Sequence, residues 1–168
     1  MADIRLYVMR HGPAVPWDGG KSMADSDRRL TREGTEKTRT AARGLKQLGV
    51  LPELVLTSPY LRALETAQLA ALELGVAARH QKGISWLEPG RPPAEAWNEL
   101  SRMDAQEILC VGHAPHLDEL IAFALGLSSP VTALKKAGVA SLRVTSWNPP
   151  AAVLLWLLKP DFLRMMAK

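Results

Sequence analysis

The chain has 168 residues, the usual length of one domain, and we expect a single domain over residues 1–168. Hydrophobic residues make up 47% of the chain and charged residues 23%, which provides a buried core and excludes a disordered or fibrous protein. The formal net charge is +4. No apolar run approaches the roughly 20 residues of a membrane-spanning helix, so we expect no membrane partner. We expect the protein to be a monomer in the cytoplasm.

The chain begins with a predicted strand, a loop and a helix. The apolar run Ile4–Val8 is short and ends in polar residues, as buried strands of an α/β sheet do. The stretch from Pro13 to Asp27 has the composition of a surface loop. Thr31 then predicts the N-cap of a helix that reaches about Leu48, and Gly49 is placed to end it.

The middle of the chain repeats this alternation of strands and helices. Leu54–Leu56 is a second short apolar run, and it leads into Ser58, which is followed by a proline. This pair predicts an N-cap and the first residue of a helix that Gly75 closes. Farther along, the patterns predict a helix, a strand and a helix over Pro93–Met103, Ile108–Val111 and Pro115–Leu125.

The C-terminal part changes to a strand pattern. Val139–Trp147 and Ala151–Leu158 are rich in apolar and β-branched residues, and the turn sequence Asn148-Pro149-Pro150 separates them. We therefore expect two neighbouring strands here. Together with the earlier alternation, they predict a three-layer α/β/α domain with helices on both faces of a mixed, mostly parallel sheet.

The first predicted strand runs directly into Arg10, His11 and Gly12. Open α/β sheets bind ligands at the carboxyl ends of their strands, which is where these residues lie. Gly12 permits a close turn, Arg10 offers donors that match phosphate oxygens, and His11 offers an imidazole that can act as nucleophile, base or ligand. The alternative is structural, with Arg10 in an ion pair and His11 in an ordinary hydrogen bond.

Two further strand ends carry residues of the same kind. Arg62 falls in the first turn of the helix after the second strand, where the helix dipole disfavours a cation unless an anion is present. The alternative for Arg62 is pairing with Glu65 or another nearby carboxylate. Gly112 and His113 follow the third strand. Two arginines and two histidines at three strand ends predict a phosphate or oxyanion pocket.

These residues resemble the signatures of the histidine phosphatase superfamily, whose fold is phosphoglycerate mutase-like. Arg10-His11-Gly12 matches its Arg-His-Gly, Ser58 to Ala67 matches Ser-Pro-x-x-Arg-Ala-x-x-Thr-Ala, and Gly112-His113 matches Gly-His, in the same order. Residues 28–34 are similar to its Arg-Pro-Leu-Thr-x-x-Gly, with Arg29 in place of proline. The matches extend over about the first two thirds of the chain. The short chain, without room for a helical lid, looks most like the SixA-type phosphohistidine phosphatases.

The resemblance implies a role for each matched residue. His11 would attack phosphorus and carry the phosphoryl group, while Arg10, Arg62 and His113 would hold its oxygens. Arg28 is implied as a further substrate contact, and its alternative is a solvated loop arginine. Phosphoryl transfer needs positioning and charge neutralisation, which these side chains can supply, so we expect no metal and no cofactor. The predicted reaction is hydrolysis of protein phosphohistidine.

The proton donor is less clearly marked. Glu88 lies roughly where superfamily members carry an acidic residue, but its surroundings depart from the family's Trp-Glu-Gly. A phosphorylated imidazole leaves more readily than an alkoxide, so a weak acid would suffice for phosphohistidine and would limit the hydrolysis of alkyl phosphates.

Several alternatives remain open from the sequence. The substrate could be a small phosphoester, with the protein a metabolite phosphomonoesterase or mutase, or the pocket could bind phosphate without catalysis. His113, His116 and Asp118 could instead hold a metal, although Pro115 makes a shared face doubtful. The basic residues are scattered and no run of five or more occurs, so we expect no nucleic-acid partner.

Overall fold

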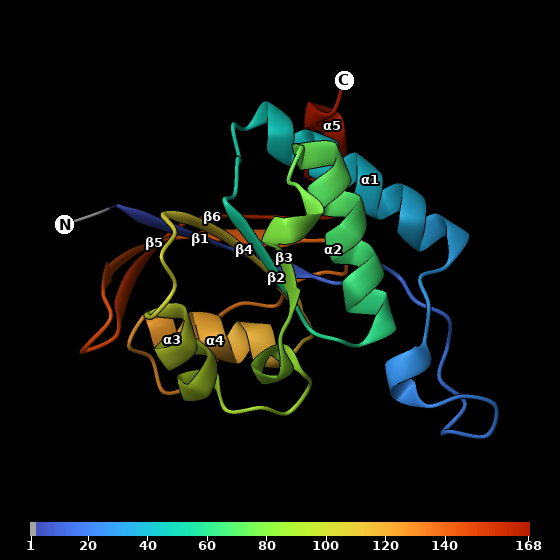
Figure 1. Cartoon of the computed structure of the whole chain (residues 1–168), viewed down its shortest axis with the longest axis horizontal. Helices are drawn as coiled ribbons and strands as arrows, with labels where there is room; N and C mark the ends of the chain where they lie inside the picture. Colours follow the sequence, from blue (N-terminus) through green and yellow to red (C-terminus); the bar gives the residue numbers. More distant parts are fainter. Residues whose placement is uncertain (1–2) are drawn as a thin grey trace.

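The computed structural model describes residues 3–168, which form a six-stranded sheet with helices on both faces (Figure 1). The strand order is β3-β2-β4-β1-β5-β6; the first four strands are parallel, and β5 and β6 form an antiparallel extension. The strands are β1 (Ile4–Arg10), β2 (Leu54–Thr57), β3 (Gln81–Gly83), β4 (Glu107–Gly112), β5 (Val139–Ser146) and β6 (Ala151–Leu158). The helices are α1 (Arg32–Gln47), α2 (Leu61–Leu74), α3 (Pro93–Leu100), α4 (His116–Ala124) and α5 (Pro160–Met166).

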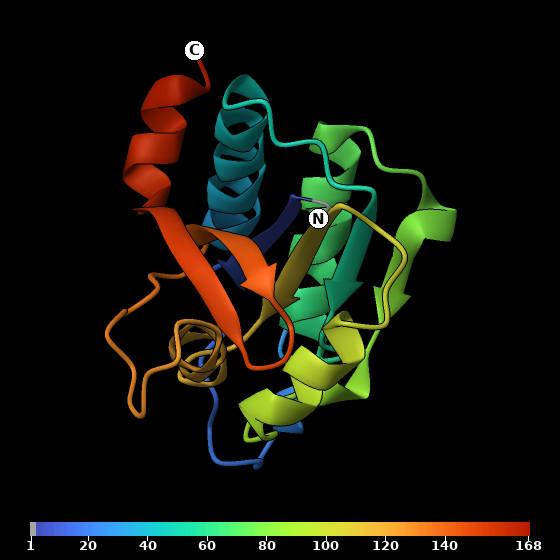
Figure 2. The same ribbon diagram turned by 90° about the vertical axis from the view of Figure 1, so that its left-hand side faces the viewer.

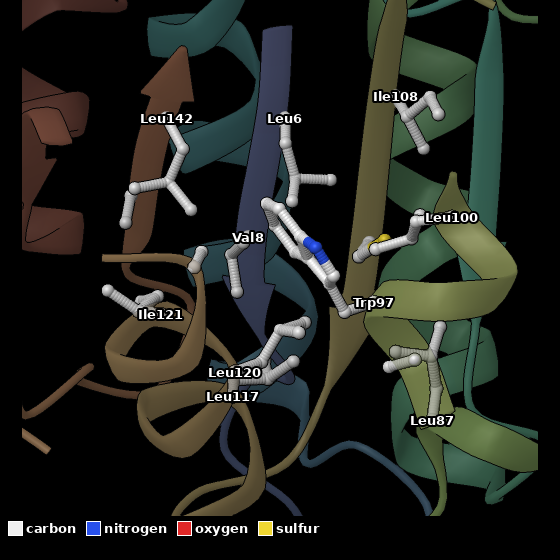
Figure 3. Packing of buried hydrophobic residues seen from close by; sticks show 14 of the residues in the cluster. Leu6, Val8, Leu87, Trp97, Leu100, Ile108, Leu117, Leu120, Ile121 and Leu142 are labelled. Carbon is white, nitrogen blue, oxygen red and sulfur yellow. The ribbon is translucent and has the colours of Figure 1, made fainter. Parts of the chain in front are cut away.

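The helices form two layers, with α1, α2 and α5 on one face of the sheet and α3 and α4 on the other (Figures 1 and 2). The central strand β1 supplies both cores because alternate side chains point to opposite faces. Leu6 and Val8 pack with Trp97 of α3 (Figure 3). Met9 instead packs with Leu45 of α1 on the other face. The predicted α/β/α layers and mixed sheet are confirmed.

Local sequence signals determine both ends of α1. The Thr31 hydroxyl accepts a hydrogen bond from the Gly34 N–H at 2.9 Å, which satisfies one of the free donors of the first turn. After the helix, Gly49 adopts φ +77°, a left-handed conformation that glycine reaches without strain. The predicted cap and stop of this helix are confirmed.

The predicted start of α2 is wrong by a few residues. The helix begins at Leu61 with Tyr60 as its N-cap, not at Ser58. The Ser58 hydroxyl instead accepts the Tyr60 N–H at 3.2 Å and contacts a histidine from β4, so it closes a turn that precedes the helix. The predicted end of α2 at Gly75 is confirmed.

Three other differences concern short segments. Helix α3 ends at Leu100 rather than Met103, because a tight turn, with the Arg102 N–H bonded to the Glu99 carbonyl at 3.2 Å, redirects the chain towards β4. The sequence pattern predicted no residue range for β3 and no helix at α5. Of the helices in residues 3–168, none is long and apolar enough to cross a membrane.

The sheet brings three strand ends together at one edge. Strand β4 lies between β1 and β2, and all three run in the same direction. The pairing continues past the strands, since the His11 N–H donates to the Gly112 carbonyl at 2.9 Å and the Ser58 N–H donates to the Val111 carbonyl at 3.0 Å. Residues that directly follow these strands are therefore held close to one another.

Candidate active site

His11 lies where β1 ends, and its imidazole is oriented by its own neighbour. The Nδ1 atom lies 2.7 Å from the Gly12 carbonyl oxygen, which accepts only from a protonated nitrogen. The proton therefore sits on Nδ1, and Nε2 keeps its lone pair. Burial lowers the pKa of His11 to about 4; the Gly12 contact opposes this shift, and the charges of Arg62 and Arg10 add to it. At neutral pH the ring is uncharged, and its Nε2 lone pair has the chemistry of a nucleophile.

Arg62, the second residue of α2, faces that lone pair. Its Nε lies 3.3 Å from His11 Nε2 in a buried environment. The rest of its guanidinium is held by Asp25, with 2.7 Å to the backbone oxygen and 3.1 Å to a carboxylate oxygen. Arg62 does have a carboxylate partner, but it is Asp25 and not Glu65, which pairs with Arg29 instead.

Arg28 joins the site through the same carboxylate. Its Nη1 donates to Asp25 at 2.9 Å, and its Nε donates to the Val15 carbonyl at 2.8 Å. Burial alone would raise the pKa of Asp25, but the hydrogen bonds and charges of Arg28 and Arg62 outweigh it and lower the pKa. Arg28 thus has fixed partners in the loop. The Asp25 carboxylate that it binds also binds Arg62, the residue that contacts His11.

Arg10 is fixed from the opposite side of the site. Its Nη1 donates to the Leu134 carbonyl at 2.9 Å, and its buried Nε has no hydrogen-bond partner within residues 3–168. Asp118 supports this contact because it accepts hydrogen bonds from the Leu134 N–H at 3.1 Å and from Thr132 at 2.6 Å. The guanidinium therefore retains a donor for a phosphoryl oxygen.

His113 follows β4, and its ring centre lies 5.3 Å from that of His11. Its Nε2 is 2.8 Å from the Ser58 hydroxyl, while its buried Nδ1 has no partner among the described residues. Burial lowers the pKa of His113 to about 3, and the charges of His11 and Arg62 contribute. Tyr60 packs its ring between His113 and Arg62, at 5.3 Å from each.

Glu88 lies outside the hydrogen-bond network of these residues. It is half-buried in the turn after a 3₁₀ helix at Ser85–Leu87, which lies beside the end of β4. Its N–H bonds the Ser85 carbonyl at 3.0 Å, but its carboxylate has no hydrogen-bond or ion-pair partner in the part of the chain that the structure describes. The structure thus gives Glu88 a place near the strand ends without a defined role.

The possible metal cluster is not formed. Asp118 is buried and bonded to Thr132 and Leu134, whereas both ring nitrogens of His116 lack partners. Within residues 3–168, no group of three or more histidine, cysteine, aspartate or glutamate side chains is arranged to hold a metal ion. Asp118 serves the loop that fixes Arg10 instead.

The sequence did not reveal the residues that hold the family-signature residues in place. Asp25 lies in a 3₁₀ helix of the loop that was expected only to cover the surface, and Ser58 was assigned to a helix cap. Thr66 accepts the Gly12 N–H at 3.0 Å and donates to the Arg62 carbonyl at 2.7 Å, so it joins two of the strand ends. The spacing of Asp25 to Arg28 allowed an ion pair, but Asp27 was an equal candidate by sequence.

The assembled geometry is suited to an oxyanion. An uncharged nucleophilic nitrogen, two guanidinium groups and a second imidazole converge from β1, α2 and β4. Phosphoryl transfer needs a nucleophile in position and fixed positive charge around the phosphoryl oxygens. Arg10, Arg62 and His113 supply such groups around His11.

Two solved structures are similar to the whole chain. The protein histidine phosphatase SixA, complexed with tungstate, superposes with a TM-score of 0.84 at 24% identity, covering 95% of this chain and 99% of that one. A phosphoserine phosphatase variant from Entamoeba histolytica, complexed with phosphoserine, has a TM-score of 0.69 at 18% identity, with 95% and 99% coverage. At these identities the likeness establishes the fold.

Sequence comparison establishes the family. A protein of Picosynechococcus sp. with no assigned function is 38% identical over 152 residues, which is 83% of this chain and 85% of that protein. The family model of the histidine phosphatase superfamily (branch 1) matches residues 6–91, a stretch that contains His11, Arg28 and Arg62. On this match and the shared fold, the chain belongs to the histidine phosphatase superfamily, branch 1.

Proposed function

We propose that this protein is a phosphatase that hydrolyses phosphohistidine in proteins through a phosphohistidine intermediate on His11, with no metal required. The whole chain would act as one domain, in the cytoplasm. His11 Nε2 forms a bond to phosphorus while the bond between phosphorus and the substrate imidazole breaks, and the leaving nitrogen takes up a proton. Water then attacks the phosphorylated His11, which releases phosphate and restores the free imidazole.

One observation carries the proposal above the others. The Gly12 carbonyl holds the His11 proton on Nδ1, so Nε2 presents its lone pair beside the Arg62 guanidinium. A histidine that only stabilised the fold would not need a defined tautomer facing a buried cation. Arg10, Arg62 and His113 would hold the three non-bridging oxygens of the phosphoryl group. They would neutralise its negative charge, a task that Mg²⁺ performs in part in other phosphotransferases.

The leaving group favours phosphohistidine over an alkyl phosphate. Within residues 3–168 the Glu88 carboxylate forms no hydrogen bond or ion pair with His11 or with the three residues around it, so none of them fixes it as a proton donor. An imidazole departs with little help, whereas an alkoxide needs protonation in the transition state. The similarity to a protein histidine phosphatase supports the same substrate, and the similarity to a phosphoserine phosphatase keeps a small phosphoester as the second candidate.

For the slower, alkyl substrates we propose Glu88 as the donor, because it follows a 3₁₀ helix beside the end of β4 and its carboxylate is left free to reach a leaving group. Replacement by glutamine keeps the size of the side chain and removes the acidic proton that the carboxyl group could donate. The Glu88→Gln variant should lose roughly a hundredfold in kcat on phosphoserine and less than about threefold on phosphohistidine. Equal losses on both substrates would contradict this assignment.

The proposed function is tested by phosphate release in the presence of a chelator. The substrates are a phosphohistidine-bearing protein and a panel of small phosphomonoesters, and the enzymes are wild type, His11→Ala and His80→Ala. His80 lies outside the site and contacts Arg79, so it serves as the matched histidine control. We expect the phosphoprotein to be the best substrate, with activity lost only in His11→Ala.

Two other results would change the conclusion. A strong preference for one small ester, still dependent on His11, would assign the protein to metabolism as a phosphomonoesterase or mutase. No release that depends on His11 from any substrate would leave a phosphate-binding module.

A further inference from the structure

A basic groove lies next to the candidate active site. It has a volume of about 490 Å³, and its charged lining consists of Arg10, Lys37, Lys135, Lys136, Lys159 and Asp161. We call it the lysine groove. Arg10 belongs both to this groove and to the site around His11, so the two are continuous at that side chain.

Most of the positively charged side chains in the lysine groove have no acidic partner within residues 3–168. Lys37 pairs with Glu33 at 3.3 Å, but Lys135, Lys136 and Lys159 form no ion pair within residues 3–168. All three of these lysines are exposed. The single carboxylate, that of Asp161, is itself exposed and has Arg164 at 4.0 Å. Several cations around one concave surface attract anions, and such a field also speeds their association.

The turn that carries two of the lysines is held in a fixed place beside the nucleophile. The Ala137 N–H donates to the carbonyl oxygens of Arg10 at 3.0 Å and His11 at 3.2 Å. Ala137 has φ +63°, a left-handed conformation that is strained for a non-glycine residue. Its backbone contacts therefore compensate for local strain, and they hold Lys135 and Lys136 at the rim of the site.

The lysine groove lies close enough to His11 to affect the electrostatics of its imidazole. The charge of Lys136 contributes to the lowered pKa of His11, after burial and the two arginines. Lys159 enters from the other side, at the junction of β6 and α5, and Lys37 comes from α1. Lysines from three separate segments thus line a surface next to the His11 site, and the proposed function assigns none of these lysines to the phosphoryl oxygens.

We propose that the lysine groove binds acidic side chains of a protein substrate, on the surface next to its phosphohistidine. This inference rests on the proposed function and adds a rule for substrate choice. Lysine offers a mobile point charge, whereas arginine offers the planar fork that matches a phosphate. A shallow surface lined by lysines therefore suits several carboxylates at variable positions better than one second phosphate group.

The test uses six peptides and three enzymes. The peptides carry either phosphohistidine or phosphoserine at one position, and for each the flanking residues are acidic, neutral or basic. The enzymes are wild type, the double variant Lys135→Gln/Lys159→Gln, and the control Lys46→Gln/Lys82→Gln. The control removes the same charge from exposed lysines outside the groove. Thermal unfolding confirms that all three are folded.

In the wild type and the control, acidic flanks should lower KM by roughly fivefold to tenfold relative to neutral flanks, with little change in kcat. Basic flanks should raise KM. The double variant should show almost no dependence on flanking charge, and added salt should weaken the dependence in the wild type. Any other pattern, including no flank effect or the same effect in all three enzymes, overturns the proposal.

The design separates this proposal from the function on which it rests. A preference for phosphohistidine over phosphoserine tests the function, whereas the effect of the flanks tests the groove in either series. A small bisphosphate, fructose 1,6-bisphosphate, is included as a competitor. If it is hydrolysed faster than every peptide and depends on Lys135 and Lys159, the groove binds a second phosphate and the protein-docking proposal is wrong.

Discussion

An imidazole attacks phosphorus through an unprotonated nitrogen, and two neighbours of His11 prepare it to do so. The Gly12 carbonyl fixes the proton on Nδ1, and Arg62 directs a donor at Nε2. Arg62 in turn depends on Asp25, which holds both terminal nitrogens of its guanidinium. The nucleophile is thus oriented by one backbone oxygen, and its cationic neighbour by one loop residue.

Asp25 is therefore expected to control the rate without touching the substrate. In Asp25→Ala, Arg62 and Arg28 lose their shared carboxylate, so kcat should fall by roughly tenfold to a hundredfold while the protein stays folded. Asp27→Ala is the matched control, because the only hydrogen bond of that carboxylate within residues 3–168 comes from Ser26. Steady-state kinetics on the phosphohistidine protein provides the measurement. Equal effects of the two substitutions would contradict this role.

The residues that match the family signatures were easier to predict from the sequence than the residues that hold them in place. Arg10, His11, Arg62 and His113 could be placed together because each ends a strand, directly follows one or opens the next helix, and parallel strands align these positions. Asp25 could not be placed, since it lies in a loop whose path depends on contacts with α2. Local pattern carries no information about such contacts between distant segments.

The elements show the same division between local and distant causes. Helix α1 was predicted at both ends because Thr31 and Gly49 act on their own backbone. Strand β3 was missed because its three residues are mostly exposed and show no apolar alternation. Helix α5 was missed because only Pro160 and Leu163 of its seven residues are buried, and it is held by its contact with α1.

That contact can be tested at Gly44. A Cβ atom at this position would collide with the backbone carbonyl of Leu163, which cannot move without shifting α5. Gly44→Ala should therefore lower the free energy of unfolding by about 2 kcal/mol. In a helix without this contact, the same substitution stabilises by up to about 1 kcal/mol. Urea unfolding decides the sign, with Gln47→Ala as an exposed control in the same helix.

At the scale of the whole molecule, buried uncharged histidines link stability to pH. Burial lowers the pKa of His11 to about 4 and of His113 to about 3, and it also lowers the pKa of His116. In the unfolded chain these groups titrate near 6.5. As pH falls below 6.5, the unfolded state takes up protons that the folded state does not. Stability is therefore complete above about pH 6.5 and declines as pH falls towards 4.

Urea unfolding between pH 7 and 4 should show this decline, with each such histidine contributing up to about 1.4 kcal/mol per pH unit. His116 is the best probe because both of its ring nitrogens lack hydrogen-bond partners in the described part of the chain, and it is not one of the residues around His11. In His116→Leu the slope should be smaller than in the wild type. A stability that is constant or rises on acidification would contradict the buried neutral state.

The most direct measurement of the central claim is the mass of the enzyme during turnover. The protein is mixed with a phosphohistidine-bearing substrate and stopped in alkali, where phosphohistidine is stable, and its intact mass and proteolytic fragments are determined. We predict one added phosphoryl group on His11 in the wild type and none in His11→Ala. Phosphate release by the wild type with no phosphoryl group on His11 at any time point, or phosphorylation at a different residue, would contradict the account.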